Sequence, residues 1–288
     1  MLPFVIAGLA LGSIYALSGI GLVLLYRASG TLNLAQGAYG ALAVLIGWEL
    51  NQVYLVALLP ALALGFLAAP VLSVVWGRLV GRALAQQDPV VRATATLGPA
   101  LMVLGLCNWH WNDKARTLRL PSDDHGFFVA GVRVSMTQVL VLVLAVVVTV
   151  VATWLLRVTR TGTAMRALAD DRELSSLLGV RVRRVEVLAW AISGVLAGVS
   201  AIPLASLTVL TANNLTFLVI PAIAAALLGR LVSLWWTLLG GITIGVLQAM
   251  VTPVTELAPY RSLVPFVAAV AITLWLGRRV SYTTRSAA

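Results

Sequence analysis

Polar side chains that could handle a solute are rare in this chain, and the clearest group lies at residues 33–37. Asn33 and Gln36 stand between Gly30 and Gly37, in a short segment flanked by long apolar runs. Amide side chains both donate and accept hydrogen bonds, so they could bind a small solute or satisfy an irregular backbone. The residues alone leave two interpretations open: a capped cytoplasmic turn, or a polar element at the mouth of a conduit.

The residue patterns of common enzymes are missing from the sequence. A phosphate-binding P-loop needs a lysine directly after glycine, but the one lysine, Lys114, follows Asp113. His110 and His125 are the two histidines and Cys107 is the one cysteine, so zinc sites, Ser–His proteases and internal disulfides are not indicated. We therefore expect a protein that is not an enzyme, has no ATPase motif, and needs no metal or other cofactor.

Composition places these residues in a membrane protein. Of 288 residues, 60% are hydrophobic and 10% are charged, whereas soluble domains carry about 25% charged residues. About 20 apolar residues cross a bilayer as a helix. Runs without charge predict nine crossings, near 3–26, 37–50, 53–77, 93–111, 136–156, 185–206, 215–229, 235–252 and 262–277. The prediction is an all-α polytopic protein with one transmembrane domain over 1–288 and eight to ten crossings, because the second and seventh are short.

The distribution of basic residues predicts the orientation. With nine crossings, 15 Lys and Arg residues fall on one side and 5 on the other. Basic residues accumulate on the cytoplasmic side, so we expect the N-terminus outside and the C-terminus inside. The net charge of +10 is then explained by the membrane and its lipids, without a nucleic-acid partner.

The longest predicted inside loop, 157–184, contains seven arginines and three acidic residues. Thr163 is expected to cap a short helix with Met165 and Leu168 on one face, and Asp170 with Glu173 resembles a capping box for a second helix. That second helix is expected to bury Leu174, Leu177 and Leu178 and to end at Gly179 in the left-handed conformation. The residues alone leave open whether this pair docks on a partner, packs on its own bundle, or lies on anionic lipid.

Several motifs resemble one family. Gly12-Ser13-Ile14-Tyr15-Ala16-Leu17, Leu32-Asn33-Leu34-Ala35-Gln36-Gly37, Thr161-Gly162, Arg166-Ala167, Asp170-Asp171 and Leu177-Leu178-Gly179-Val180 are similar to segments of the inner-membrane permeases of branched-chain amino acid ABC transporters. The resemblance runs from Leu9 to about Met250. The chain departs from the family pattern at 199–201, and at 229–233, where Gly-Gly-x-Gly-Ser is usual and this chain has Gly-Arg-Leu-Val-Ser.

The resemblance implies a permease subunit of an ABC importer for branched-chain amino acids or related small amino acids and amides, in a bacterial-type inner membrane. It implies four kinds of partner: two cytoplasmic ATPases, a second and non-identical permease, an extracytoplasmic binding protein, and the small-molecule substrate. The residues expected to couple to the ATPase are Arg166, Leu168, Asp170, Asp171, Leu174, Leu177, Leu178 and Gly179. Those expected along the substrate path are Gly12, Ser13, Tyr15, Asn33, Gln36 and Gly37.

Two other functions are compatible with the residues. An ATP-independent channel or secondary carrier would also be lipid-embedded, although no carboxylate lies in the middle of a predicted span, where proton-coupled carriers need one. A purely structural membrane subunit would show the same composition, but Asn33→Ala and Gln36→Ala would then leave solute uptake unchanged.

Overall fold

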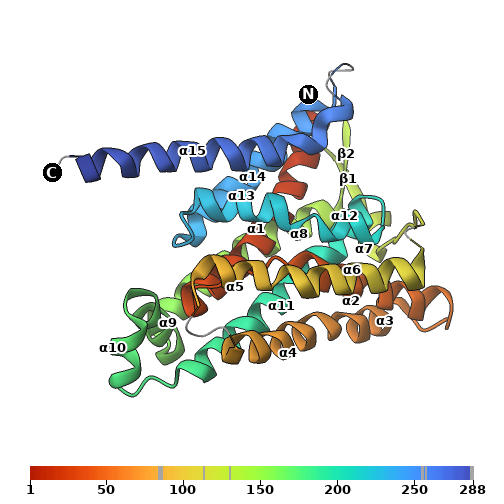
Figure 1. The fold of residues 1–288 in the computed structure, drawn as a ribbon. Coiled ribbons are helices and arrows are strands. Elements are labelled where there is room, and N and C mark those ends of the chain that lie inside the picture. The colour runs from red at the N-terminus through yellow and green to blue at the C-terminus, as the bar shows by residue number, and fades with distance from the viewer. Residues whose placement is uncertain (84–86, 113, 130, 254–255, 257, 286–288) are drawn as a thin grey trace.

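The computed structural model describes residues 1–83, 87–112, 114–129, 131–253, 256 and 258–285. Helices account for 79% of the residues, which confirms the all-helical prediction (Figure 1). The α-helices are α1 (Leu2–Ser29), α2 (Gln36–Gln52), α3 (Leu58–Phe66), α4 (Ala68–Ala83), α5 (Pro89–Ala95), α6 (Leu97–Trp111), α7 (Pro121–Asp124), α8 (Met136–Val158), α9 (Arg160–Asp170), α10 (Arg172–Leu177), α11 (Val182–Leu207), α12 (Ala212–Thr216), α13 (Val219–Leu228), α14 (Leu234–Val251) and α15 (Val264–Arg285). A 3₁₀-helix, η1, spans Ala258–Leu263.

Helix α1 is the central element of the bundle. In its most apolar stretch 89% of the residues are buried, and it packs against α14, α11, α13 and α8. Small residues allow the closest approach: a Cβ placed on Gly245 of α14 would lie 2.3 Å from the backbone nitrogen of Gly12. Lipid offers no hydrophobic drive for helix association, so such close backbone packing is what holds membrane helices together.

The bundle has two distinct ends (Figure 1). One end carries α9 and α10, and the opposite end carries α7, the N-terminus and a two-stranded sheet. That sheet pairs β1 (Gly126–Val129) with β2 (Val132–Ser135) in antiparallel register, with Gly126 opposite Ser135. The sequence did not predict these strands, because each has four residues and both lie in the connection between apolar runs.

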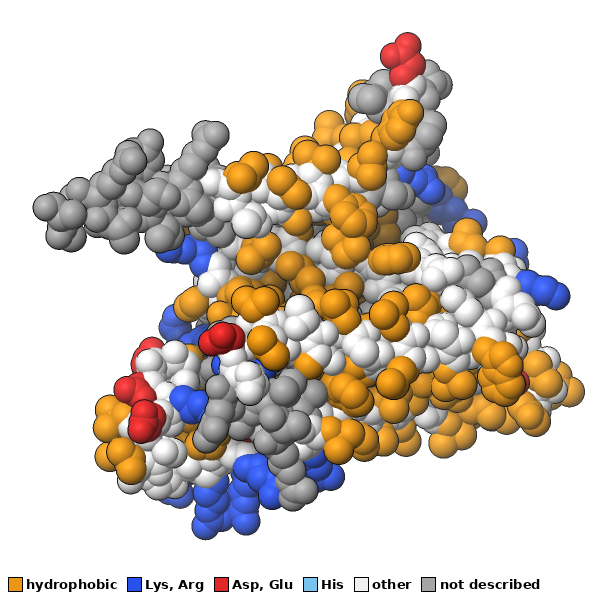
Figure 2. Space-filling model, in the orientation of Figure 1, with side chains coloured by type: hydrophobic (Ala, Val, Ile, Leu, Met, Phe, Trp, Pro, Cys, Tyr) orange, Lys and Arg blue, Asp and Glu red, His pale blue; other side chains and the backbone are white. Residues whose placement is uncertain are grey.

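Each of the nine predicted crossings coincides with a helix or a pair of successive helices. Among the residues that the structure describes, six helical segments are long and apolar enough to span a membrane, while Ala212–Leu228 and Val264–Leu274 are shorter apolar segments. Orange apolar side chains lie along the helices across the face shown in Figure 2, as expected for a surface in contact with lipid. The structure supports a multi-pass membrane protein; the number of crossings and their sidedness stay predictions. The side chains of four arginines assigned to the inside, Arg82, Arg278, Arg279 and Arg285, lie outside the described part of the chain.

One departure from the family pattern, at 229–233, lies in the turn between α13 and α14, where two residues with side chains adopt the left-handed conformation. Arg230 and Leu231 have φ values of 53° and 56°, in the left-handed region that costs a residue with a side chain about 1–2 kcal/mol. Arg230 stands where the family pattern has glycine. We expect Arg230→Gly to stabilise the folded protein by about 1 kcal/mol, part of the gain being lost to the greater freedom of glycine in the unfolded chain. Thermal unfolding in detergent measures this; an unchanged or lower midpoint contradicts it.

Candidate functional site

The helical structure is interrupted between α1 and α2, at residues 30–35, which we call the break. The first residue of α2 lies beside the middle of α1. Gln36, the first residue of α2, donates from Nε2 to the carbonyl oxygen of Ser18 at 2.7 Å and to its Oγ at 2.9 Å. Ser18 lies 11 residues before the end of α1 at Ser29, which is about 16 Å along a helix. Residues 30–35 therefore run back into the bundle before the helix resumes, and Thr31, Asn33 and Ala35 are buried there.

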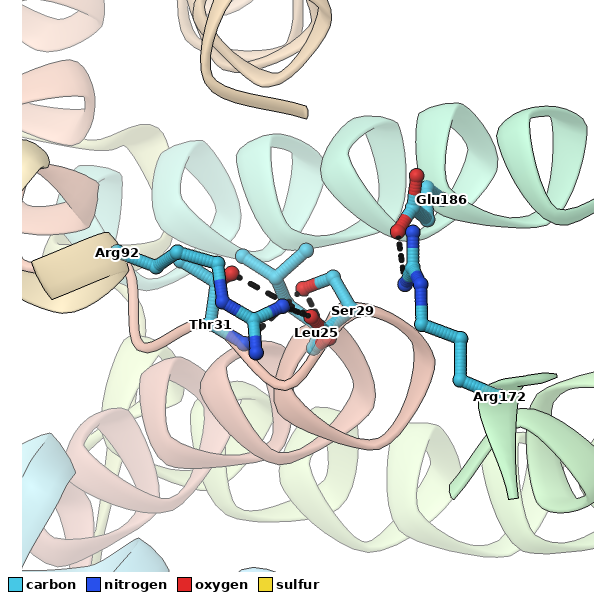
Figure 3. Close-up of polar contacts among 6 residues, drawn as sticks. All are labelled: Leu25, Ser29, Thr31, Arg92, Arg172 and Glu186. Atoms are coloured by element: carbon cyan, nitrogen blue, oxygen red, sulfur yellow. Dashed lines mark hydrogen bonds and ion pairs between the residues drawn. The ribbon is translucent and has the colours of Figure 1, made fainter. Parts of the chain in front are cut away.

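Several polar groups of this break are paired by other parts of the protein (Figure 3). Arg92 of α5 donates from Nη1 to the carbonyl oxygen of Ser29 at 2.8 Å, where α1 ends. The hydroxyl of Thr96 accepts from the backbone nitrogen of Leu34 at 2.9 Å and lies 3.2 Å from the carbonyl oxygen of Leu32. Irregular backbone persists at membrane depth when other parts of the protein complete its hydrogen bonds. Arg92 in α5 and Thr96 at the junction of α5 and α6 therefore hold the two sides of the break.

The α1 residues of the expected substrate path lie inside the bundle. The Ser13 hydroxyl donates to the carbonyl oxygen of Leu9 at 2.7 Å, and the Tyr15 hydroxyl donates to Oε1 of Gln248 on α14 at 2.8 Å. Gly12 lies at the crossing of α1 with α14, where a Cβ would come within 2.5 Å of the Cα of Ile242. In this conformation Gly12 and Tyr15 connect α1 with α14, whereas the hydroxyl of Ser13 bonds within α1.

Gln36 and Gly37 join α2 to the same region from the other side of α1. Besides its bonds to Ser18, Gln36 accepts at Oε1 from the hydroxyl of Ser193 on α11 at 2.8 Å. A Cβ on Gly37 would lie 2.1 Å from the carbonyl oxygen of Thr216. The structure thus brings the start of α2, the end of α12, the middle of α11 and the middle of α1 together.

Asn33 is the last of the expected path residues, and only the oxygen of its side-chain amide is hydrogen-bonded. Its Oδ1 accepts from the backbone nitrogen of Ala35 at 3.1 Å, whereas its buried Nδ2 has no protein partner within the described ranges. Sequence analysis missed Ser18, Ser193 and Gln248, which hold the expected path residues. In the sequence, each of the three is a polar residue within an uncharged apolar run. Such residues commonly form hydrogen bonds between membrane helices.

The first half of loop 157–184 is fixed to the bundle. Met165 and Leu168 of α9 are buried in one cluster with Val23, Leu24 and Leu25 near the end of α1. The N-cap of α9 is Thr159, whose hydroxyl accepts from the backbone nitrogen of Gly162 at 3.0 Å. The prediction of Thr163 as the cap is wrong, because α9 begins at Arg160 and Thr163 already lies inside it.

The second half of the loop is exposed. Leu174, Leu177 and Leu178 are 54%, 79% and 77% exposed, so the expectation that they are buried is wrong for this chain on its own. The cap of α10 is Asp171, not Asp170, since Asp171 Oδ1 accepts from the backbone nitrogen of Leu174 at 2.9 Å. Gly179 has a φ of +84°, which confirms its left-handed conformation. An apolar surface of three leucines is therefore displayed on a rigidly capped helix.

One ion pair ties this loop to the bundle, and two charged side chains of the loop are exposed. Arg172 pairs with Glu186 of α11 at 2.5 Å, which ties α10 to the start of the next long helix (Figure 3). Arg166 is exposed, and its Nη2 lies 3.5 Å from the hydroxyl of Thr163. Asp170 is also exposed, at the end of α9. Both remain available to a partner.

A carboxylate organises the opposite end of the molecule. Asp123 of α7 accepts from Ser206 of α11 at 2.6 Å, from the backbone of Leu120 at 2.8 Å, and from the hydroxyl of Thr137 on α8. Burial alone would raise the pKa of Asp123, but these hydrogen bonds outweigh it and lower the pKa below its usual value. Asp123 therefore joins α7 to the start of α8 and to the end of α11.

The sign of this shift gives a pH prediction. A carboxyl group whose pKa is lower in the folded state stabilises it above the unfolded pKa of about 3.9, and the stabilisation is lost as pH falls through the folded value. We expect Asp123→Asn to lower the unfolding temperature at pH 7, and this difference to disappear at a pH below the lowered pKa of Asp123 in the folded protein. Parallel melts in detergent at both pH values test this; an equal difference at both pH values contradicts it.

Within the described residues, no group of three or more His, Cys, Asp or Glu side chains could hold a metal ion. The comparisons with known proteins give the family of the chain. A family model described as the permease component of the branched-chain amino acid transport system matches residues 4–273.

Relatives of established name cover most of the chain. The high-affinity branched-chain amino acid transport system permease protein BraD of Pseudomonas aeruginosa is 28% identical over 258 residues, covering 84% of this chain and 83% of the relative. The high-affinity branched-chain amino acid transport system permease protein LivH of Escherichia coli is 25% identical over 262 residues, covering 84% of this chain and 83% of the relative. The probable LivH of Methanocaldococcus jannaschii is 26% identical over 257 residues, covering 83% of this chain and 78% of the relative. The chain therefore belongs to the permease family of branched-chain amino acid ABC transport systems.

Proposed function

We propose that this chain is the transmembrane permease subunit of an ABC importer that takes up branched-chain amino acids or related small amino acids and amides. The names of its relatives support the substrate class. One observation supports coupling to a separate ATPase: α10 displays Leu174, Leu177 and Leu178 on the surface, although its neighbour α9 is packed into the bundle. Exposed apolar surface on a rigid, capped helix is typical of a docking site.

The proposed assembly contains two cytoplasmic ATPases, a second permease that is not identical to this chain, and an extracytoplasmic binding protein. It lies in a bacterial-type inner membrane, with the α9–α10 end facing the cytoplasm. The chain brings no P-loop lysine of its own, so the free energy for transport comes from the ATPase subunits. Closure of the ATPase pair would move α10 and shift the permeases between two states.

A continuous series of contacts connects the docking surface to the proposed substrate path. Loop helix α9 packs through Met165 and Leu168 onto the last turns of α1. Helix α1 ends at Ser29, which is held by Arg92, and the break beyond it positions Gln36. We infer that movement of α9 reaches the path through α1 and the break. Asn33, Gln36 and Gly37 at the start of α2, with Gly12, Ser13 and Tyr15 of α1, then line the path when their contacts between helices are released.

Thr96 tests this route. We expect Thr96→Val to reduce substrate uptake about ten-fold while the ATPase subunits still co-purify, because the change leaves the backbone nitrogen of Leu34 in the break without its acceptor, at a cost of about 1–3 kcal/mol. The matched control is Thr94→Val in α5, two residues before Thr96, whose exposed hydroxyl donates to the carbonyl oxygen of Val91 in its own helix. Equal uptake by the two variants, per bound ATPase, would remove the break from the coupling route.

Competition uptake tests the function itself. In a strain lacking this subunit, restored uptake of labelled leucine should require ATP and the binding protein, and excess isoleucine and valine should compete. Competition by urea alone would move the substrate to small amides. Uptake without an ATPase would indicate a channel or secondary carrier, and uptake unaffected by Asn33→Ala and Gln36→Ala would indicate a structural subunit.

A further inference from the structure

We propose that the cleft between the end of α4 and the start of α11 binds the headgroup of an anionic phospholipid. This site is separate from the docking surface on α10 and from the expected substrate path. It lies at the end of the bundle that carries α9 and α10 (Figure 1), which the distribution of basic residues predicts to be cytoplasmic.

The cleft is strongly basic. It has a volume of about 960 Å³ and is lined by Arg78, Leu79, Arg181, Val182, Arg183, Arg184, Val187, Leu188 and Ala191. All four arginines are exposed. In the part of the chain that the structure describes, none of the four is paired with a carboxylate. Figure 2 shows basic side chains gathered at this end of the molecule.

The carboxylates nearest to the cleft do not neutralise it. Glu186 lines a smaller adjoining cleft of about 180 Å³ and is already paired with Arg172 at 2.5 Å. Asp170, Asp171 and Glu173 line a different cleft, which has Val182 in common with the basic one. The positive charge of the cleft is therefore uncompensated and available to an anion.

The other wall of the cleft is apolar and continues along the spans. Leu79 and Leu188 are 55% and 40% exposed. Leu188 and Ala191 also line a second, apolar cleft of about 640 Å³ against Val151 and Leu155 of α8. Leu188 lies six residues into α11, about 9 Å along the helix. A ligand that fits both surfaces carries a negative charge at one end and an apolar chain at the other.

A phospholipid fits this surface better than an ATPase subunit or a free anion. Arginine pairs with phosphate through two parallel hydrogen bonds, and basic pockets between transmembrane helices bind acidic lipid headgroups. An ATPase docked outside the membrane would leave the apolar wall of Leu188 and Ala191 uncovered. Inorganic phosphate would likewise use the arginines alone.

Titration of the full chain, in nanodiscs of phosphatidylcholine, with phosphatidylglycerol tests the proposal. We expect Arg183→Gln with Arg184→Gln to weaken phosphatidylglycerol binding roughly 25-fold. Each arginine near an anionic lipid contributes about a five-fold factor, and the two factors multiply. The matched control is Arg157→Gln with Arg160→Gln, two exposed arginines on the same predicted side that do not line the cleft. Arg183→Lys with Arg184→Lys should recover most of the binding.

Three outcomes overturn the proposal. The first is an equal loss in the control pair, which would indicate non-specific attraction to the membrane. The second is inorganic phosphate competing as well as the lipid, which would indicate a site for a free anion. The third is loss of ATPase co-purification with lipid binding unchanged, which would assign the arginines to the ATPase interface. If the glutamine pair does not fold, Arg78→Gln on α4 replaces it, with about a five-fold loss expected.

Discussion

Leu177→Asp combined with Leu178→Asp should abolish coupling to the ATPase. The two side chains are 79% and 77% exposed, so the fold of the chain itself does not depend on them. Two carboxylates in place of apolar surface would have to be desolvated at the interface, which is costly without a partner for each charge. We expect ATP hydrolysis stimulated by the binding protein to fall at least ten-fold, together with co-purification of the ATPase. Both are measured on the purified complex in nanodiscs.

Ser176→Asp is the matched control for this change. It adds a negative charge to the same helix, but Ser176 is an exposed polar residue and not part of the leucine surface. The control should retain most of the stimulated hydrolysis. If the double variant hydrolyses ATP as well as the control does, α10 is not the docking helix, and the proposal of a coupling loop at 157–184 fails.

Gly37→Ala should have the largest effect on assembly of the bundle. A Cβ at this position would lie 2.1 Å from the carbonyl oxygen of Thr216, so the backbones of α2 and α12 would have to separate. Overpacking in a core costs about 1–3 kcal/mol, and two backbones in contact offer no flexible side chain that could move aside. We expect a large loss of folded protein in detergent and of uptake, measured by size-exclusion profile and transport.

Gly105→Ala provides the comparison. Gly105 lies in α6, and a Cβ there would meet no atom within 4 Å, so this change should leave both yield and uptake near those of the unmodified protein. If Gly37→Ala behaves in the same way, the contact between α2 and Thr216 is not required, and α2 can be displaced without loss of the fold.

Loop 157–184 shows how far local patterns can be trusted. The sequence predicted two short helices and a left-handed Gly179, and these features are confirmed because they depend on neighbouring residues only. The caps were placed wrongly, at Thr163 and Asp170, since Thr159 and Asp171 offer the same chemistry a few residues away. The burial of Leu174, Leu177 and Leu178 was also predicted wrongly, because periodicity identifies an apolar face without saying what covers it.

Composition and the positions of charged residues determined by themselves that this is a multi-pass helical membrane protein, and short motifs determined its family. Both follow from local rules, because a backbone in lipid must pair its own polar groups and long uncharged runs can do so only as helices. Only the tertiary structure decided that α2 begins beside the middle of α1, that Arg92 and Thr96 hold the break, and that Gln36 joins α1 to α11. These contacts connect residues 18 to 157 positions apart, and a pattern of neighbouring residues carries no record of which helix packs against which.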